Sequence, residues 1–561
     1  MTLARWLPTT VLGTLLAYLV VVPIALLVYS GFKPTGFPTD PGFTFAHYHD
    51  VYLSPGFPRL FLNTVVFAVG STILALAVSI GFAWLTERTD IPARNLFRAL
   101  IILPMATPPI LLAIAWTLLL DPRIGSVNVW LEHALHLTAA PFNVFTLPGI
   151  IFVEALSLVP TGYLILAAAF RNVDPSLEEA ALVSGARPGA MLRRVVLPIL
   201  APAILAAGAF LLIATFVVFD VPGALGMPVR IFVLSTQIFF WYDLSTTGLP
   251  QYGNIAALAT LFLAILALLG FSYQRMTRSA QRFVTITGKG FRVRRFPLGQ
   301  WRPFALAGVV GYVICAVGAP LLLLLWTSLM PYETPVTLSA FHLITPANYL
   351  ALISNVRFLE ALRNSLVIAI VSASAVAALS AAVAWVVVRT HAIGRNIVDI
   401  LAFAPIAVPG VMIGMALVVV YLTFHAVHVY GTIWIIAIAY VTTYLSYGSR
   451  AMRAAMLQIH PELEEAAQTS GARWLTVFRR ITFPLTSTAF IAVWVWVLAH
   501  SMRELSSALM LHGESNTVLT TLLWDYWSGG EPTKAATVGV WLIVALFIAI
   551  YTWQKRETAR S

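Results

Sequence analysis

Residues 174–198 read DPSLEEAALVSGARPGAMLRRVVLP, and residues 460–484 read HPELEEAAQTSGARWLTVFRRITFP, 286 positions further along the chain. We call these two segments the elbows. An aspartate or histidine followed by proline predicts the start of a helix. Gly185 and Gly471 predict where that helix ends, because glycine readily adopts the left-handed conformation that terminates helices. The pattern therefore predicts a short helix, a turn and a second, arginine-rich helix in each copy.

The small residues of each elbow share one predicted helix face. Leucine, two alanines and a serine recur at positions i, i+3, i+4 and i+7 of each copy. The paired glutamates 178–179 and 464–465 are expected to present charge beside this face. Pro198 and Pro484 are expected to open the membrane span that follows.

The sequence around the elbows is apolar enough for lipid. Of 561 residues, 59% are hydrophobic and only 10% are charged, against about 25% in an average soluble domain. Apolar stretches of about 20 residues indicate membrane spans. The sequence predicts an all-α polytopic membrane protein with about twelve transmembrane helices, at 8–30, 62–85, 97–120, 146–170, 199–219, 254–273, 303–327, 363–388, 398–423, 431–449, 485–507 and 535–553.

The net charge of +11 follows the membrane topology. With both termini in the cytoplasm, most lysines and arginines fall in or beside cytoplasmic loops, as the positive-inside rule requires. This distribution explains the basic balance without nucleic acid. The first apolar run is interpreted as a retained span and not as a cleaved signal peptide.

The chain is an internal repeat. Leu62 to Asn95 aligns without gaps to Arg363 to Asn396 at an offset of 301, and in that register Arg88 meets Arg389. An even number of six spans per copy gives two parallel six-helix repeats. We predict a first half at 1–273, a basic cytoplasmic linker at 274–302 and a second half at 303–561. The linker carries eight basic and no acidic residues, which suits a solvated tether or contact with anionic lipid.

The elbows resemble the signature of binding-protein-dependent ABC importer permeases with the MetI-like fold, which reads Glu-Ala-Ala, three residues, Gly, nine residues, Ile-x-Leu-Pro. Valine replaces isoleucine in the first copy, and phenylalanine replaces leucine in the second. The resemblance implies that each elbow is a coupling helix that docks on a separate cytoplasmic ATPase dimer. The coupling residues that it implies are Glu179, Ala180, Ala181, Gly185, Pro198, Glu465, Ala466, Ala467, Gly471 and Pro484.

The same resemblance implies a permease subunit of the bacterial inner membrane, not an enzyme, which receives its solute from a periplasmic binding protein. The sequence agrees that ATP chemistry belongs elsewhere. Gly288-Lys289-Gly290 lacks the upstream glycine and the Ser/Thr of a phosphate-binding loop. No catalytic constellation and no cofactor site are expected in this chain, because ATP and magnesium would be bound by the partner ATPase.

Charged residues within spans are rare and are therefore candidates for function. Asp220 ends the fifth span, and Arg503 and Glu504 end the eleventh, so these three are candidates for the translocation path. The alternative is that Arg503 and Glu504 satisfy each other or nearby backbone. Histidine pairs in the external loops lack a completing carboxylate or thiol, so no metal site is predicted.

A finer resemblance, to one group of permeases, bears on which solute is transported. Residues 220–239, 285–292 and 503–511 look like the fused permeases of the ferric-iron importer group, whose relatives carry 2-aminoethylphosphonate, thiamine or sugar phosphates. Ferric iron is the first choice that this implies, and 2-aminoethylphosphonate is the next. An ion-coupled secondary transporter of 6+6 helices is the alternative from another class. It would require several charged residues deep in the spans.

Overall fold

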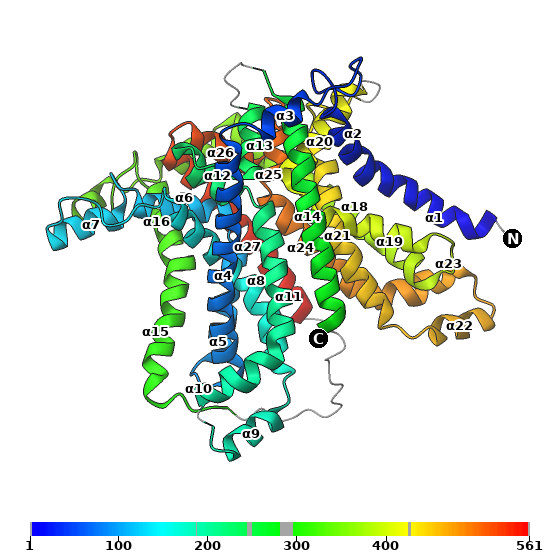
Figure 1. Cartoon of the computed structure of the whole chain (residues 1–561), viewed down its shortest axis with the longest axis horizontal. Helices are drawn as coiled ribbons and strands as arrows, with labels where there is room; N and C mark the ends of the chain where they lie inside the picture. Colours follow the sequence, from blue (N-terminus) through cyan, green and yellow to red (C-terminus); the bar gives the residue numbers. More distant parts are fainter. Residues whose placement is uncertain (1–2, 187, 244–248, 281–294, 425–427, 559–561) are drawn as a thin grey trace. The chain divides into compact units, whose positions relative to one another are not determined.

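The computed structural model describes residues 3–186, 188–243, 249–280, 295–424 and 428–558, and helices dominate it (Figure 1). The chain forms two compact units. The first-half unit comprises Pro55–Gln237 and Ala264–Pro346, and the second-half unit comprises Met1–Ser54, Ile238–Leu263 and Ala347–Ser561. No strand forms among the described residues, so the predicted all-α class is confirmed.

The first-half unit is built mainly from the first repeat. Its helices are α4 (Phe57–Arg88), α5 (Arg94–Ile102), η2 (Leu103–Ala106), α6 (Pro109–Leu120), α7 (Ser126–Leu135), α8 (Leu147–Arg171), α9 (Pro175–Val183), α10 (Pro188–Met191), η3 (Leu192–Val196), α11 (Leu197–Val217), α12 (Asp220–Gly226), η4 (Met227–Val229), η6 (Gly299–Trp301), α15 (Arg302–Val313), η7 (Ile314–Gly318), α16 (Ala319–Ser328) and η8 (Leu338–Leu343). Helices α13 (Leu234–Asp243) and α14 (Tyr252–Ala280) contribute residues to both units.

The second-half unit is built mainly from the second repeat. Its helices are α1 (Leu3–Leu16), η1 (Ala17–Val21), α2 (Val22–Ser30), α3 (Ala46–Tyr52), α17 (Ala347–Ile353), α18 (Val356–Arg389), α19 (Arg395–Phe403), η9 (Ala404–Ala407), α20 (Gly410–Thr423), α21 (Ile433–Leu457), α22 (Glu462–Thr469), α23 (Trp474–Val477), η10 (Phe478–Thr482), α24 (Phe483–Arg503), α25 (Ser506–Leu511), α26 (Leu519–Ser528) and α27 (Pro532–Thr558).

Eight helices within the described residues are long and apolar enough to cross a membrane, and each falls on one of the twelve predicted spans. Of the other four, the span predicted at 431–449 lies in α21 and that at 535–553 lies in α27, whose apolar part is the shorter Pro532–Ile548. The last two, at 97–120 and 398–423, are bent. The multi-span architecture thus follows from hydropathy along the chain.

The expectation of continuous spans at 97–120 and 398–423 is wrong. Arg94–Ala106 meets Pro109–Leu120 at 95°, and Arg395–Ala407 meets Gly410–Thr423 at 112°. The break comes directly before proline in both cases: Thr107 has ψ 129° and Val408 has ψ 119°. A proline ring clashes with a helical preceding residue and pushes it into the extended region. Asp220–Val229 and Leu234–Asp243 form a third bent pair, at 66°, which the hydropathy reading missed.

The core of each unit depends on close helix approach at a glycine. A Cβ added to Gly162 of α8 would lie 2.6 Å from the Ser79 Oγ of α4. In the second-half unit, a Cβ added to Gly448 of α21 would approach the Ser380 Oγ of α18 even more closely. Small residues let membrane helices pack backbone to backbone, where dispersion replaces the hydrophobic effect as the attractive force.

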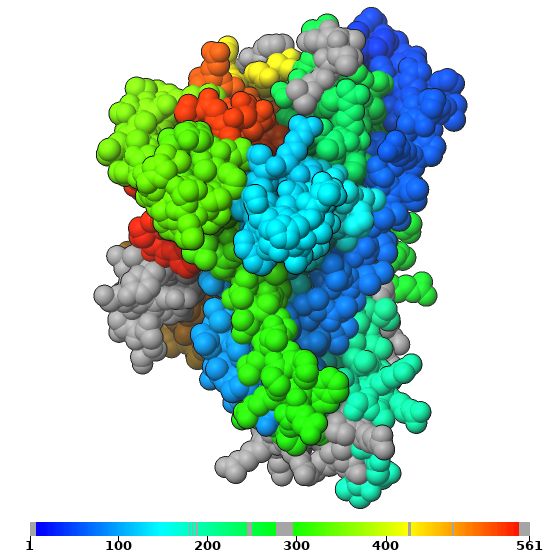
Figure 2. All heavy atoms as spheres, turned by 90° about the vertical axis from the view of Figure 1, so that its left-hand side faces the viewer, coloured from blue at the N-terminus to red at the C-terminus, as the bar shows by residue number. Residues whose placement is uncertain are grey.

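The first span of the second half packs in the first-half unit. The Tyr312 hydroxyl of α15 donates to the Leu156 carbonyl at 3.3 Å, and its ring lies edge-on to Phe82 of α4. In Figure 2, the green spheres of α15 lie beside the blue spheres of α4 and α5. Contacts within this unit therefore cross the boundary between the two sequence halves.

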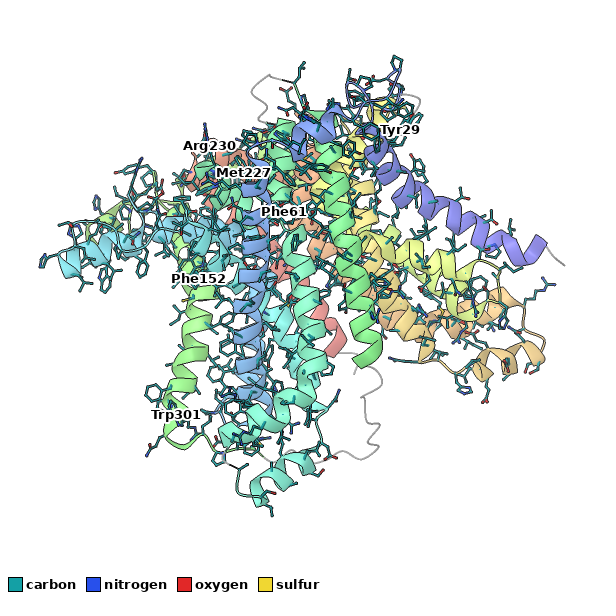
Figure 3. The ribbon with its side chains drawn as sticks, in the orientation of Figure 1. Tyr29, Phe61, Phe152, Met227, Arg230 and Trp301 are labelled. Atoms are coloured by element: carbon teal, nitrogen blue, oxygen red, sulfur yellow. The ribbon has the colours of Figure 1, made fainter. Side chains whose placement is uncertain are left out.

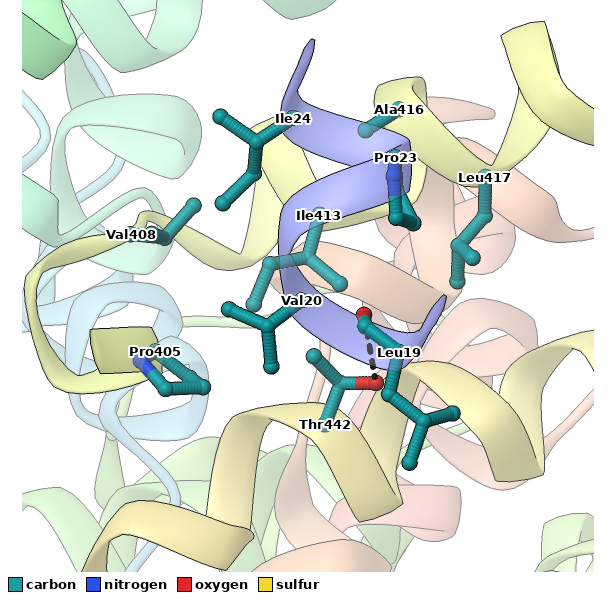
Figure 4. Close-up of a pocket in the computed structure, with 10 residues that line it drawn as sticks. All are labelled: Leu19, Val20, Pro23, Ile24, Pro405, Val408, Ile413, Ala416, Leu417 and Thr442. Carbon is teal, nitrogen blue, oxygen red and sulfur yellow. Dashed lines mark hydrogen bonds between the residues drawn. The ribbon is translucent and has the colours of Figure 1, made fainter. Parts of the chain in front are cut away.

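In return, the first span of the first half packs in the second-half unit. Its helices α1 and α2 pack on α19 and α20 of the second-half unit, where the Tyr18 and Tyr421 hydroxyls are 2.9 Å apart. Figure 4 shows the small apolar pocket at this seam, where the Thr442 hydroxyl donates to the Leu19 carbonyl at 3.5 Å. Pro23 and Pro405 also line this pocket.

Aromatic side chains mark the ends of the two exchanged spans, as Figure 3 shows for Tyr29 and Trp301. Tyr29 lies at the end of α2 and is 38% exposed, while Trp301, at the start of α15, is 71% exposed. Tyrosine and tryptophan favour the membrane–water interface because their rings are apolar with one polar atom. We therefore expect these residues to lie at headgroup level.

Candidate functional site

The elbow helices begin as the sequence predicts. Helix α9 starts at Pro175, and the Asp174 Oδ1 accepts a hydrogen bond from the Ser176 amide at 2.9 Å. Helix α22 starts at Glu462, after Pro461, and no side chain caps it. The two elbows thus share one geometry, with the stronger cap in the first copy.

Glycine ends both elbow helices in the left-handed conformation, which confirms the prediction. Gly185 has φ 84° and Gly471 has φ 85°. A Cβ at either position would meet nothing within 4 Å. The need for glycine is therefore conformational and does not come from crowding.

The first glutamate of each pair points toward the membrane domain, so the expectation that both present charge is wrong. Glu178 is only 2% exposed, and the side chain of Glu464 is 14% exposed. Adjacent residues on a helix point about 100° apart, so one of two neighbouring glutamates turns inward when the other faces out. Glu465 is exposed, whereas the side chain of Glu179 lies outside the described residues.

A buried arginine receives the inward glutamate of the first elbow. Arg88, the last residue of α4, places its guanidinium 3.4 Å from both carboxylate oxygens of Glu178. Its Nη2 also donates to the Phe170 carbonyl at 2.6 Å and to the Val173 carbonyl at 2.7 Å. Arg88 therefore joins the end of α4, the end of α8 and the elbow.

The second elbow has the same arrangement at the equivalent position. Arg389, the last residue of α18, donates from Nε to the Glu464 Oε1 at 3.1 Å. Its Nη2 donates to the Met456 carbonyl at 3.1 Å and to the Ile459 carbonyl at 2.8 Å. We call Arg88–Glu178 and Arg389–Glu464 the Arg–Glu clamps.

Sequence reasoning assigned no role to these arginines. The available signal was that Arg88 and Arg389 occupy matching positions of the repeat. Both side chains are largely buried, at 1% and 8% exposure. Leaving a buried charge without its partner costs about 3–5 kcal/mol, so each clamp is a strong local constraint.

Each elbow runs into the next span through a π-helical turn. The turn η3 connects α10 to α11 without a break, and the turn η10 connects α23 to α24 in the same way. Pro198 and Pro484 lie in the first turn of α11 and α24, as predicted. The arginine-rich helix is therefore continuous with the span, because the wider turn accommodates proline, which lacks an N–H.

The small-residue face of each elbow is open. Leu177 is 45% exposed and Leu463 is 51% exposed. The other members of the face are exposed or half-buried, namely Ala180, Ala181 and Ser184 in the first elbow and Ala466, Ala467 and Ser470 in the second. This arrangement lets a partner approach the helix backbone closely.

Acidic residues lie at the turn after span five and after span eleven. Glu504 accepts hydrogen bonds from the Tyr444 hydroxyl at 3.0 Å and from the Ser507 amide at 3.2 Å. Asp220 begins α12, and Arg503 ends α24; both are half-buried. Their assignment to a translocation path stays a prediction. The carboxylate of Glu504 is held by Tyr444 and Ser507.

No group of three or more His, Cys, Asp or Glu side chains in the described part of the chain is placed to hold a metal ion. Residues 281–294 of the basic linker, including Gly288-Lys289-Gly290, lie outside the described residues. The end of the linker rejoins the first-half unit, where the Leu298 amide donates to the Asp90 Oδ1 at 2.8 Å.

Comparison with known proteins supplies independent evidence on the family of this chain. The family described as "Binding-protein-dependent transport system inner membrane component" matches residues 77–282 and 369–560. The ferric transport system permease protein FbpB of Actinobacillus pleuropneumoniae is 27% identical over 513 residues, which cover 89% of this chain and 71% of that protein. The Fe(3+)-transport system permease protein FbpB 2 of Haemophilus influenzae is 25% identical over 512 residues, covering 90% of this chain and 91% of that protein. A solved bacterial ABC transporter involved in alginate import matches at 21% identity and a TM-score of 0.37, over 47% of this chain and 89% of that chain.

Proposed function

Because this chain belongs to the family of binding-protein-dependent transport system inner membrane components, matched in both halves, we propose that it is the fused permease of an ABC importer for ferric iron. One chain supplies both six-helix repeats and both elbows. The observation that carries the proposal is the pair of elbows with one geometry, in each of which the first helix ends at a left-handed glycine.

Each elbow docks on one subunit of a cytoplasmic ATPase dimer. The exposed small residues around Ala180 and Ala466 admit a partner, and the exposed Glu465 offers it charge. The coupling residues are Glu179, Ala180, Ala181, Gly185 and Pro198 in the first elbow and Glu465, Ala466, Ala467, Gly471 and Pro484 in the second. ATP and magnesium belong to the ATPase, so this chain performs no hydrolysis.

A periplasmic binding protein delivers the solute to the external loops. Both termini lie in the cytoplasm, which places the elbows on the ATPase side of the inner membrane. ATP binding closes the ATPase dimer and moves the elbows, and the helices then expose the path first to one side and then to the other. Asp220, Arg503 and Glu504 are candidates for groups along that path.

Ferric iron is proposed because the two relatives described above are named as ferric transport permeases, and each is matched along most of its length. The binding protein is the component that meets the free solute first. Its selectivity therefore identifies the solute more directly than the permease does.

The docking test uses co-purification. Glu179→Lys together with Glu465→Lys reverses charge on both elbows and is expected to reduce recovery of the ATPase with the tagged permease. Glu132→Gln, on α7, is the control and should recover the ATPase fully. Normal recovery and normal uptake with the double lysine variant would contradict docking through the elbows.

The solute test is calorimetric titration of the binding protein that crosslinks to this permease. Ferric iron and 2-aminoethylphosphonate are compared, with thiamine and a hexose phosphate alongside. Tight binding of iron alone supports the proposal. Tight binding of the phosphonate would replace the solute and leave the permease assignment in place.

A further inference from the structure

Each elbow has two kinds of attachment to its unit. It passes a left-handed glycine between its two helices, and at its far end it runs through a π-helical turn, η3 or η10, into the next span. At its near end it is tied by an Arg–Glu clamp. Glycine and π-turns tolerate changes of backbone angle more readily than regular helix does. The stiffer attachment is therefore the clamp.

The clamp joins the elbow to a core span by direct side-chain contact. Arg88 closes α4, and α4 packs along both α8 and α11. Arg389 closes α18, which packs along α21 and α24 in the same manner. A displacement of the inward glutamate therefore acts directly on α4 in the first-half unit and on α18 in the second-half unit.

We propose that Arg88 and Arg389 are positioning residues that make each elbow move together with its core span, so that closure of the ATPase reorients α4 and α18. This inference rests on the proposed function, since it assumes that the ATPase drives the elbows. The guanidinium suits the role because its fixed fork binds carbonyls and a carboxylate at once. Burial keeps water from replacing these bonds.

The two clamps are not equal. The Thr482 hydroxyl donates to the Glu464 Oε1 at 2.8 Å, so the second clamp also holds the turn that leads into α24. Val196 occupies the equivalent position of the first elbow and has no hydroxyl. The second clamp therefore ties its elbow to one more span than the first.

The test measures solute moved per ATP hydrolysed, in vesicles containing the full complex of permease, ATPase and binding protein. Glu178→Gln and Glu464→Gln remove the charge and keep the size of the side chain. Coupling free energies between protein sites are typically about 1–3 kcal/mol, so we expect the ratio to fall about five-fold or more while ATPase recovery stays normal.

Matched controls separate coupling from general stability. Glu87, next to Arg88 on α4, forms an ion pair with Arg98 of α5, which Glu87→Gln breaks. Asp399→Asn breaks a pair with Arg453 in the second-half unit. Neither pair includes an elbow residue. The assembled complexes of these controls are expected to keep the wild-type ratio.

The outcomes are distinct. A wild-type ratio in assembled Glu178→Gln and Glu464→Gln complexes would overturn the proposal, and so would an equal loss in the controls. Loss of ATPase recovery in the clamp variants would assign the glutamates to docking and would also overturn it. Failure of the proposed function would appear differently, as a wild-type permease that recovers no ATPase. Thr482→Val gives a graded check, with a smaller fall in the ratio than Glu464→Gln.

Discussion

At the scale of single residues, the elbow turn depends on one backbone angle. Gly185→Ala and Gly471→Ala place a Cβ in open space but in a left-handed conformation that L-residues disfavour by about 1–2 kcal/mol. We expect both variants to weaken the elbow and to lower ATPase recovery in co-purification. Gly189→Ala, in helix α10 with equally open surroundings, is the control. Equal recovery from Gly471→Ala and Gly189→Ala would show that the left-handed angle is unimportant.

His512 gives a residue-level prediction about pH. Burial alone would lower the pKa of His512, but the Asp525 carboxylate, 3.6 Å from its Nε2, and the charge of Asp243 raise it above its usual value. The protonated imidazole therefore stabilises the fold. Its contribution is present at low pH and is lost as pH rises through the raised pKa. Asp525 also binds Arg357 at 2.6 Å, so the carboxylate joins α26 to α18.

The measurement is thermal stability of the purified permease from about pH 5 to 8. We expect His512→Gln to lose on the order of 1 kcal/mol at the acidic end and less at the alkaline end. His133→Gln, at an exposed position in the last turn of α7, is the control. A loss that grows with pH would have the wrong sign for this account.

At the scale of elements, close approach of α4 and α8 determines the packing of the first-half unit. Gly162→Ala places a Cβ 2.6 Å from the Ser79 Oγ, which must shift or push the helices apart. We expect a loss of about 1–3 kcal/mol, measured by thermal unfolding in detergent. Gly81→Ala on α4 meets nothing within 4 Å and should be close to neutral. Partial recovery with Ser79→Ala, Gly162→Ala would identify the contact, and no recovery would place the strain elsewhere.

At the element scale, proline also determines where two of the predicted spans bend. The paired breaks before Pro108 and Pro409 turn two predicted spans into bent pairs. Hydropathy shows only that these segments are apolar, and it carries no information on the direction of the helix axis. The prolines were visible in the sequence, and their effect on the preceding residue was the signal that could have located the bends.

At the scale of the whole molecule, each unit takes its first span from the other sequence half. Residues 303–561 expressed alone would lack α1 and α2, which pack on α19 and α20. We expect little folded protein from this half alone and recovery when residues 1–280 are co-expressed. The yield of detergent-soluble monodisperse protein is the measurement. An equal yield with and without the first half would contradict a role for the exchange in stability.

The sequence by itself determined the helical class, the repeat, most of the spans and the position of each elbow turn. These properties are local or periodic, since hydropathy, glycine and proline act on neighbouring residues of the chain. The tertiary structure alone decided which glutamate of each elbow turns inward, which arginine receives it, and which half supplies the first span of each unit. Arg88 and Glu178 are 90 residues apart in the chain, and Tyr18 and Tyr421 are 403 apart. Contacts at such separations arise from helix packing, in which many residues together select the partner.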